Sequence, residues 1–289
     1  HLDGAVTRLS PHLTHGIVTL PQALRAVLEH HGPLPVQHKL VFEFGWRDYF
    51  RHVWAHRGDG ILSSLRAGPL PERQYASDLP DDIRHARTGV PAIDQAVRAL
   101  QDTGYLHNHA RMWLASYVVQ LRKVHWRVGA DWMLAQVLDG DLASNHLSWQ
   151  WVAATVSERP YLFNADNVAR FAPPAWHSPG TVIDASYDEL GLIARTPLAP
   201  SLRKPSATDA GETVALEAAP PPTLRFTAPA PGVVRDRTVW LAHPWALGDP
   251  PSHLPADTLV VAVAFAEPHA RWPWAARRWA FVGERLDEL

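Results

Sequence analysis

The chain has 289 residues, 46% of them hydrophobic, a formal net charge of −2 and no cysteine. This length suggests one large domain, or a medium domain with a small one. The missing thiols exclude disulfides, thiol catalysis and cysteine-held metal centres, and the near-neutral charge confines any nucleic-acid site to a local basic patch. Thirteen Trp residues are more than packing usually requires; they are typical of proteins that bind planar rings or transfer electrons, but composition alone favours a core packed by Trp rings. Because no apolar run of about 18 residues and no signal peptide are visible, we expect a cytoplasmic protein without a membrane span.

Helical patterns dominate the first 180 residues. Thr19 and Pro21 are typical of a helix start, and Leu24, Val27 and Leu28 follow at helical spacing. Residues 60–88 are rich in Gly, Pro and Asp and predict loops with short turns. Further helices are predicted over residues 36–54, 91–100, 106–124 and 131–138, with Ile93, Ala96, Val97 and Leu100 on the buried face of the second.

The pattern changes after residue 180. Residues 195–235 hold Pro, Ala and Thr without periodicity, as in a linker or extended segment. Residues 238–241 and 258–265 predict buried strands, and residues 275–289 a closing helix. We therefore predict a mainly α protein with three parts: a helical domain over 1–180, a Pro/Ala-rich linker or extended segment over 181–235, and a small α/β module over 236–289.

The segment from Leu138 to Trp151 carries the strongest chemical signal. Asp139 and Asp141 flank a glycine, and Asn145 and two Trp residues follow. A turn of this kind aims carboxylates at ribose hydroxyls, a ring N–H or an Arg, and Asn145 offers a neutral amide to a ring atom. A surface turn or a calcium-like turn is the alternative, although the further acidic ligands of an EF-hand are absent.

Two other segments offer ring-binding groups. Asn108, Arg111 and Met112 share one helix face through their spacing and suit a polar aromatic ligand. His107 and His109, two residues apart, are expected on different faces, so we predict no metal site there.

The remaining segments are weaker signals when taken alone. Glu43, Trp46 and Arg47 line one side of the predicted 36–54 helix, which also fits an ordinary amphipathic helix with a solvated Arg. Thr7 and Ser10 precede a Pro turn and offer hydroxyls to phosphate oxygens.

Together these four segments, in this order and with residues 89–94 between them, resemble the photolyase/cryptochrome family over roughly residues 1–175. The resemblance implies an all-helical domain that holds FAD in a U-shaped conformation beside a cavity for a DNA lesion. It implies that Thr7 and Ser10 contact the FAD pyrophosphate and that Asn145 lies beside the flavin N5 position. The other implied FAD contacts are Arg47, Asn108, Arg111, Asp139 and Asp141.

The resemblance also implies roles in catalysis and DNA binding. Trp149 and Trp126 match the first two members of the electron-transfer chain that reduces the flavin. Glu43, Trp46, Asn108, Met112 and Trp151 match the residues that line a pyrimidine-dimer pocket. The predicted catalytic residues are therefore Trp126, Trp149, Asn145 and Glu43, and the candidate DNA-backbone contacts are Arg51, His109 and Arg159.

The implied activity is repair of cyclobutane pyrimidine dimers by light-driven electron transfer from reduced FAD. Enzymes for (6-4) products place His where this chain has Asn108 and Met112. A blue-light photoreceptor without repair activity is the alternative, and a binding protein that has lost FAD is a third. We expect a monomer whose partner is damaged DNA, with no metal and no membrane.

The sequence departs from the family pattern at several points. We expect the family's N-terminal antenna domain to be missing ahead of residue 1, and the outer Trp of the electron chain would fall near Ile83. His109 stands where an Arg that supports DNA binding is common. Residues 240–249 and 276–282 resemble the first strand and helix of the antenna domain, so the C-terminal module is interpreted as an antenna remnant or as a surface appendage, with little support for an antenna chromophore.

Overall fold

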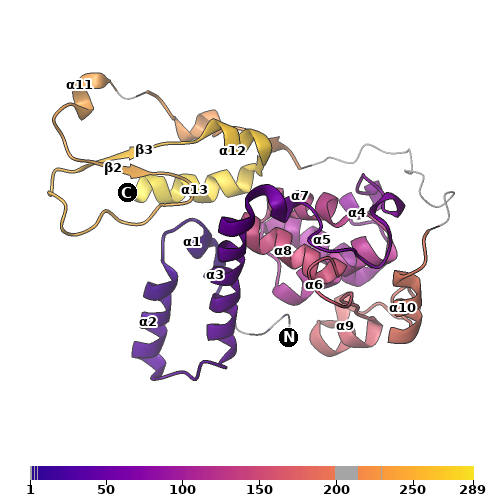
Figure 1. The fold of residues 1–289 in the computed structure, drawn as a ribbon. Helices are drawn as coiled ribbons and strands as arrows, with labels where there is room; N and C mark the ends of the chain where they lie inside the picture. The colour runs from indigo at the N-terminus through magenta and orange to yellow at the C-terminus, as the bar shows by residue number, and fades with distance from the viewer. Residues whose placement is uncertain (1, 3, 5, 199–213, 229) are drawn as a thin grey trace. The chain divides into compact units, whose positions relative to one another are not determined.

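A computed structural model describes Leu2, Gly4 and residues 6–198, 214–228 and 230–289 (Figure 1). The chain forms two compact units. Unit 1 comprises residues 1–6, 46–134 and 141–214, and unit 2 comprises residues 7–45, 135–140 and 215–289. The predicted boundaries at 180 and 235 stay a prediction, and residues 199–213 and 229 of the 195–235 segment lie outside the described residues.

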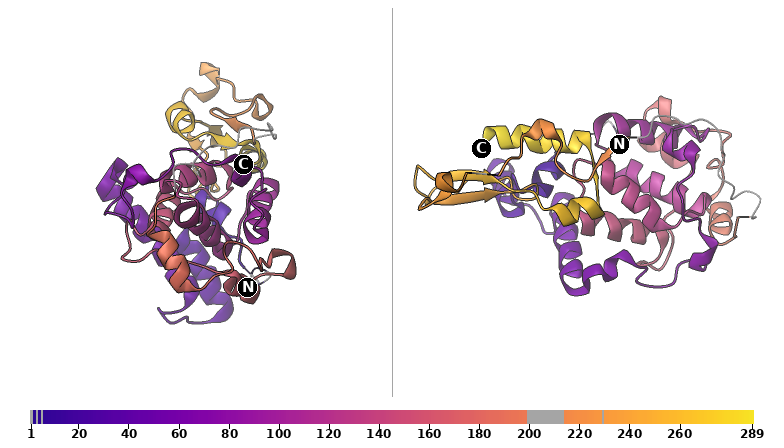
Figure 2. Two further views of the ribbon diagram at one scale, coloured as in Figure 1. Left: turned by 90° about the vertical axis from the view of Figure 1, so that its right-hand side faces the viewer. Right: turned by 90° about the horizontal axis from the view of Figure 1, so that it is seen from above.

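Unit 1 is helical. Its α-helices are most of α3 (Lys39–Arg57) and of α7 (Trp126–Gln136), together with α4 (Asp81–Arg84), α5 (Pro91–Thr103), α6 (Asn108–Ser116), α8 (Leu142–Ala153), α9 (Ala165–Phe171) and α10 (Tyr187–Ala194). Single turns η1 (Gly58–Leu62), η2 (Glu72–Gln74) and η4 (Pro174–Trp176) connect them, as expected for the 60–88 loops. Helix α6 packs against α5 and α8 (Figure 2). Among the described residues, no helix has the length and apolar character needed to cross a membrane.

Helix α5 follows the sequence signals closely. Pro91 occupies the first turn, and Gly104 ends the helix in the left-handed conformation with φ of 64°. Ile93, Ala96, Val97 and Leu100 are all buried. The predicted apolar face is therefore confirmed, and the mainly α class holds for the described chain.

The prediction of one helix over 106–124 is wrong. His107 caps α6, and after Ser116 the chain widens into the π-helical turn η3 (Tyr117–Leu121). Apolar spacing cannot separate the two hydrogen-bond patterns. Beyond this turn Lys123 is buried, and its Nζ donates to the carbonyls of Gln120 at 2.6 Å, Ile193 at 2.7 Å and Ala194 at 2.9 Å, which fastens the end of α10.

Helices α8, α9 and α10 of unit 1 had no prediction. Helix α8 is apolar on most sides and so shows no stripe to reveal it. Helix α10 begins with a capping box between Ser186 and Glu189, a signal that the sequence does carry. Helix α9 begins with Asn164, whose side chain accepts from the Asn167 amide.

A glycine lets α7 and α8 approach each other closely. Gly129 lies in α7, and a Cβ on it would overlap the indole ring of Trp149 from α8. Both Trp149 and Trp126 are 2% exposed. The ring of Trp149 therefore occupies the space that a side chain at position 129 would need.

We predict that Gly129→Ala destabilises the protein by about 1–3 kcal/mol because the added methyl displaces the Trp149 ring. Gly45→Ala is the matched control, since Gly45 also lies inside a helix and has open space around its Cα; the gain in helix propensity should stabilise it by about 0.5–1 kcal/mol. Thermal unfolding with tryptophan fluorescence measures both. Equal stabilities for the two variants would contradict the close packing.

Unit 2 combines short helices with two small sheets. Its helices are α1 (Ser10–Thr14), α2 (Leu20–His31), α11 (Pro231–Val234), α12 (Ala266–Arg271) and α13 (Ala276–Glu288), with the turn η6 (Pro222–Leu224). Thr19 caps α2 and forms a capping box with Gln22, as predicted for the helix start. Strand β1 (Leu216–Glu217) pairs antiparallel with β4 (Trp274–Ala275), and β2 (Val239–Ala242) pairs parallel with β3 (Leu259–Ala262).

The predicted buried strands are shorter and more exposed than expected. Strand β3 ends at Ala262, three residues before the predicted end at residue 265, and α12 begins at Ala266. Of the eight paired residues in β2 and β3 only Ala242 is buried. A two-stranded sheet has no neighbours to cover its edges, so apolar residues alone do not make these strands central. Helix α13 is the predicted closing helix and packs Trp279 and Val282 into the core with Ala242 (Figure 1).

An aromatic cluster encloses a buried imidazole in this core. The ring of His269 stacks on Trp245 at 5.0 Å between centroids and lies 4.5 Å from the rings of both Trp274 and Trp279. Burial, with the charge of Arg278 as a second cause, lowers the pKa of His269 to about 4. The same two causes lower the pKa of buried His15 to about 3.

We therefore predict that unit 2 loses stability in acid. In the unfolded chain these two imidazoles have a pKa of about 6.5, so between about pH 6.5 and 4 they take up protons mainly when the chain is unfolded. The free energy of unfolding therefore falls as the pH drops through this range. Each imidazole lowers it by at most about 1.4 kcal/mol per pH unit. His269→Leu should flatten part of this slope, while His253→Leu, at an exposed position, should leave it unchanged. Denaturant unfolding between pH 7 and 4.5 tests this; identical slopes for His269→Leu and the parent would refute it.

Candidate functional site

Asp141 joins two helices of unit 1. As the N-cap of α8, its Oδ1 accepts the Ser144 amide at 2.8 Å. Its Oδ2 accepts Arg51 Nη2 at 3.0 Å and Nε at 3.1 Å, and Arg47 Nη2 at 3.4 Å, both from α3. Burial alone would raise the pKa of Asp141, but the charges of Arg47 and Arg51 and the Ser144 bond outweigh it and hold this pKa below its usual value.

Two of the predicted FAD contacts, Arg47 and Asp141, are thus brought together. Arg51, predicted as a DNA-backbone contact, instead directs its guanidinium at Asp141. The sequence does not reveal this pair because 90 residues separate Arg51 from Asp141.

Substitutions at Asp141 should separate capping from ion pairing. Asp141→Ser keeps a capping hydroxyl but leaves Arg47 and Arg51 without their carboxylate, which we expect to cost about 2 kcal/mol. Asp141→Ala loses the cap as well and should be less stable than the Ser variant by about 1 kcal/mol. Chemical denaturation measures both, and equal stability of the Ala and Ser variants would rule out a capping role.

The start of α6 holds the second predicted group. Asn108 is exposed and its Nδ2 lies 3.8 Å from Met112 Sδ, so these two share a face as predicted. Arg111 donates from Nε to the Leu106 carbonyl at 2.7 Å, and its guanidinium lies 5.9 Å from the Tyr105 ring centroid.

The expectation that His107 and His109 lie on different faces is wrong. His107 precedes the helix as its N-cap, and its Nδ1 accepts the His109 amide at 3.2 Å. The two rings lie 5.3 Å apart. Helical spacing does not apply to a residue outside the helix. Within the described ranges, no group of three or more His, Cys, Asp or Glu residues could hold a metal ion.

The aromatic residues of the predicted lesion pocket are open to solvent. Trp46 is 45% exposed and Trp151 is 41% exposed. Trp46 contacts Tyr49 and Phe50 along α3, and Trp151 contacts Tyr161. Exposed indole faces of this kind are able to stack on nucleobases.

The predicted electron carriers have the opposite environment. Trp126 is buried at the start of α7 and donates from Nε1 to Ser64 Oγ at 2.9 Å. Its ring meets the ring of His146 edge to face, with 6.1 Å between centroids and 88° between planes.

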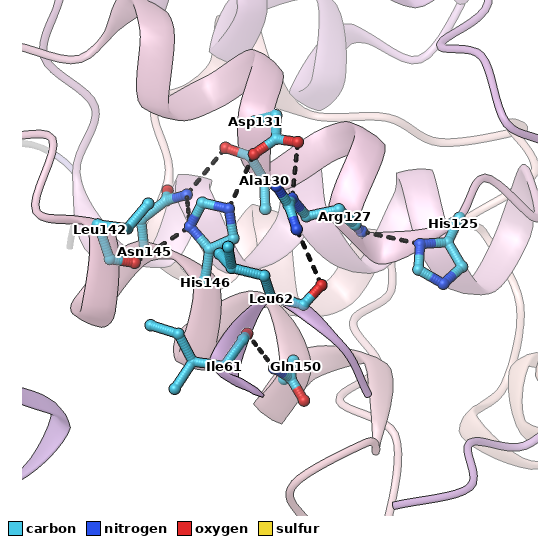
Figure 3. A network of polar contacts seen from close by, with 10 residues as sticks. All are labelled: Ile61, Leu62, His125, Arg127, Ala130, Asp131, Leu142, Asn145, His146 and Gln150. Atoms are coloured by element: carbon cyan, nitrogen blue, oxygen red, sulfur yellow. Dashed lines mark hydrogen bonds and ion pairs between the residues drawn. The ribbon is translucent and has the colours of Figure 1, made fainter. Parts of the chain in front are cut away.

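A polar network surrounds Asn145 (Figure 3). Asn145 Nδ2 donates to the Ala130 carbonyl at 2.8 Å. Next to it, His146 Nε2 lies 2.9 Å from Asp131 Oδ1, and Arg127 Nε donates to Asp131 Oδ2 at 2.7 Å. Sequence reasoning missed Arg127, Asp131 and His146 as members of this network. The four-residue spacing from Arg127 to Asp131 is nevertheless a signal for an ion pair within a helix.

The other predicted site residues belong to unit 2. Thr7 Oγ1 accepts the Leu9 amide at 3.4 Å, Ser10 begins α1, and Glu43 is exposed on the first part of α3. Asp139 is buried, and its carbonyl accepts Thr14 Oγ1 at 3.1 Å. Their predicted role at one site with the residues of unit 1 stays a prediction.

A pocket of about 510 Å³ also lies in unit 1. Its lining is aromatic, aliphatic and basic: Tyr49, Phe50, His52, Val53, His56, Arg57, Leu65, Arg66, Leu147 and Val156. None of these lining residues belongs to the predicted flavin or lesion contacts. Its size is within the range of small-molecule sites.

Comparison with known proteins identifies the helical segment. Residues 40–175 match the sequence model of a family described as the FAD binding domain of DNA photolyase. This segment belongs to the photolyase/cryptochrome family. It contains all of α3 except Lys39, and α4 to α9, and therefore Asp141, Asn145, Trp126 and Trp149.

Individual members of the photolyase/cryptochrome family match only in part. A deoxyribodipyrimidine photo-lyase of Streptomyces griseus is 40% identical over 155 residues, which are 52% of this chain and 32% of that protein. A cryptochrome DASH of Gloeobacter violaceus is 34% identical over 116 residues, 39% of this chain and 23% of that protein. A crystal structure of an archaeal photolyase from Sulfolobus tokodaii matches 71% of this chain and 47% of its own, with 26% identity and a TM-score of 0.49. The chain thus spans about a third of the length of the Streptomyces relative.

Proposed function

We propose that this protein binds FAD and uses light to transfer an electron from reduced FAD to cyclobutane pyrimidine dimers in DNA, which is the activity of a deoxyribodipyrimidine photolyase. One observation carries the proposal: in the family segment over residues 40–175, helix α7 carries the buried Trp126, and helix α8 carries both the buried Trp149 and Asn145. Buried indoles beside a flavin-binding segment suit stepwise electron transfer better than packing alone requires.

The side chains of unit 1 fit the chemistry of FAD. Arg47 and Arg111 carry guanidinium groups for the negative pyrophosphate, and Asp141 provides a carboxylate acceptor. The amide of Asn145 is held by the Ala130 carbonyl through its nitrogen, which leaves its oxygen for a ring N–H. When bound, FAD would supply the light absorption and the electron; the protein's groups hold it and tune its electronics.

The exposed residues of unit 1 support a lesion as substrate. Trp46 and Trp151 present indole faces to solvent, and Asn108 with Met112 adds an amide and a thioether on one side of α6. A pyrimidine dimer stacks poorly in duplex DNA, so flipping it out costs less than flipping a normal base. Indoles that stack on the flipped rings would offset the remaining cost.

A photoreceptor without repair activity is the second candidate, because the family includes cryptochromes. The Streptomyces photo-lyase matches more of this chain, and at higher identity, than the cryptochrome DASH does. We therefore favour repair. The monomeric state, the cytoplasmic location and the absence of a metal in the reaction remain predictions from the sequence.

Removal of the electron carriers should block light-driven reduction. After reconstitution with FAD, Trp126→Phe and Trp149→Phe should each reduce the flavin under blue light about tenfold or more slowly than the parent, because the indole donor is lost. Trp54→Phe, at an exposed position of α3, is the control and should behave like the parent.

The same preparations, chemically reduced and illuminated with dimer-containing oligonucleotides, test repair. The parent should restore intact thymines, and the Trp variants should do so too because the flavin is already reduced. A parent protein that binds FAD but restores no thymines would contradict repair and favour the photoreceptor.

A further inference from the structure

The His146 ring is buried between two hydrogen-bond acceptors. Nε2 faces Asp131 Oδ1 at 2.9 Å, and Nδ1 lies 3.1 Å from the Leu142 carbonyl, one turn earlier in α8. Both oxygens only accept, so the doubly protonated ring satisfies both contacts. The Asn145 amide nitrogen, at 3.5 Å from Nδ1, is the more distant neighbour and already donates to Ala130.

A carboxylate distinguishes this imidazole from the one at His15. His15 also faces two carbonyl oxygens, those of Pro244 and Leu138, but burial and Arg278 disfavour its charged form. His146 has the negative charge of Asp131 in direct contact. Burial opposes ionisation of Asp131, yet the His146 and Arg127 bonds outweigh this and lower the Asp131 pKa. Asp131 and Arg127 are the charged groups that α7 presents to this pair, and the centroid of the His125 ring lies 5.7 Å from that of the Trp126 ring.

The pair of Asp131 and His146 lies beside a predicted electron carrier. The ring of Trp126 is buried and meets the His146 ring edge to face. Loss of an electron from Trp126 would create a positive charge in a poorly solvated place, which is costly. The Asp131 side chain is 41% exposed while that of His146 is fully buried, so the carboxylate connects the imidazole to solvent.

We propose that Asp131 and His146 form a proton relay that compensates the charge on Trp126 when it is oxidised. When Trp126 has given one electron to Trp149, the member of the proposed chain that precedes it, His146 passes its Nε2 proton to Asp131 Oδ1, and Asp131 releases the proton to water. The charge around the indole then stays constant. When the electron returns to Trp126, one proton re-enters by the same route. His146 is thus a positioning residue for the electron path, and this role rests on the proposed function.

The protonation state of His146 is tested first, on the flavin-free protein. Heteronuclear NMR of the imidazole nitrogens, assigned with His146→Gln, should show both nitrogens protonated at pH 7, and Asp131→Asn should leave one unprotonated. A singly protonated His146 in the parent protein would overturn the relay without bearing on flavin binding.

Proton release is tested on the FAD-loaded protein. After a light flash, a pH-indicator dye should report one proton released for each Trp126 that is oxidised. The tryptophan radical signal should decay about tenfold more slowly in the parent than in His146→Gln, because charge compensation stabilises the radical. Asp131→Asn, which keeps the shape of the side chain, should lose proton release as well.

The outcomes separate the two proposals. The relay would be rejected if the tryptophan radical formed in the parent without proton release and decayed at the same rate in all variants. This outcome would leave the proposed photolyase function intact. No tryptophan radical in FAD-loaded parent protein would reject both the electron path and the relay.

Discussion

The arrangement of the site depends on the carboxylate of Asp141. One oxygen ends the turn before α8 by accepting the Ser144 amide, and the other accepts from two Arg side chains of α3. A buried carboxylate is stable only with such partners. The same carboxylate holds the first turn of α8 and the two guanidinium groups of α3. It therefore fixes the start of α8, the helix that carries Asn145 and Trp149, relative to Arg47.

The contact between α7 and α8 adds a second constraint. Gly129 provides the space for Trp149, and the Asp131 to His146 bond links the same two helices one turn further along. Aromatic and polar contacts thus alternate along one interface. Such an interface holds two buried indoles in fixed orientations, which stepwise electron transfer requires.

Much of this could be predicted from the sequence. Caps and turn residues placed α2 and α5, and five ordered segments indicated the family, while the FAD-binding groups stay a prediction. The π-helical turn after α6 escaped prediction because apolar spacing is the same on either side of it. Helix α8 escaped because it is buried on most sides and shows no stripe. The Arg51 pair with Asp141 and the His146 pair with Asp131 depend on tertiary contacts, which no local pattern encodes.

The most direct test of the account is the absorption spectrum of the purified protein, before and after incubation with FAD and removal of free ligand. The account predicts that the protein retains about one FAD per chain. Its flavin absorption bands should show the resolved vibronic structure of an isoalloxazine ring that is held away from water. A colourless protein that also retains no added FAD would contradict it.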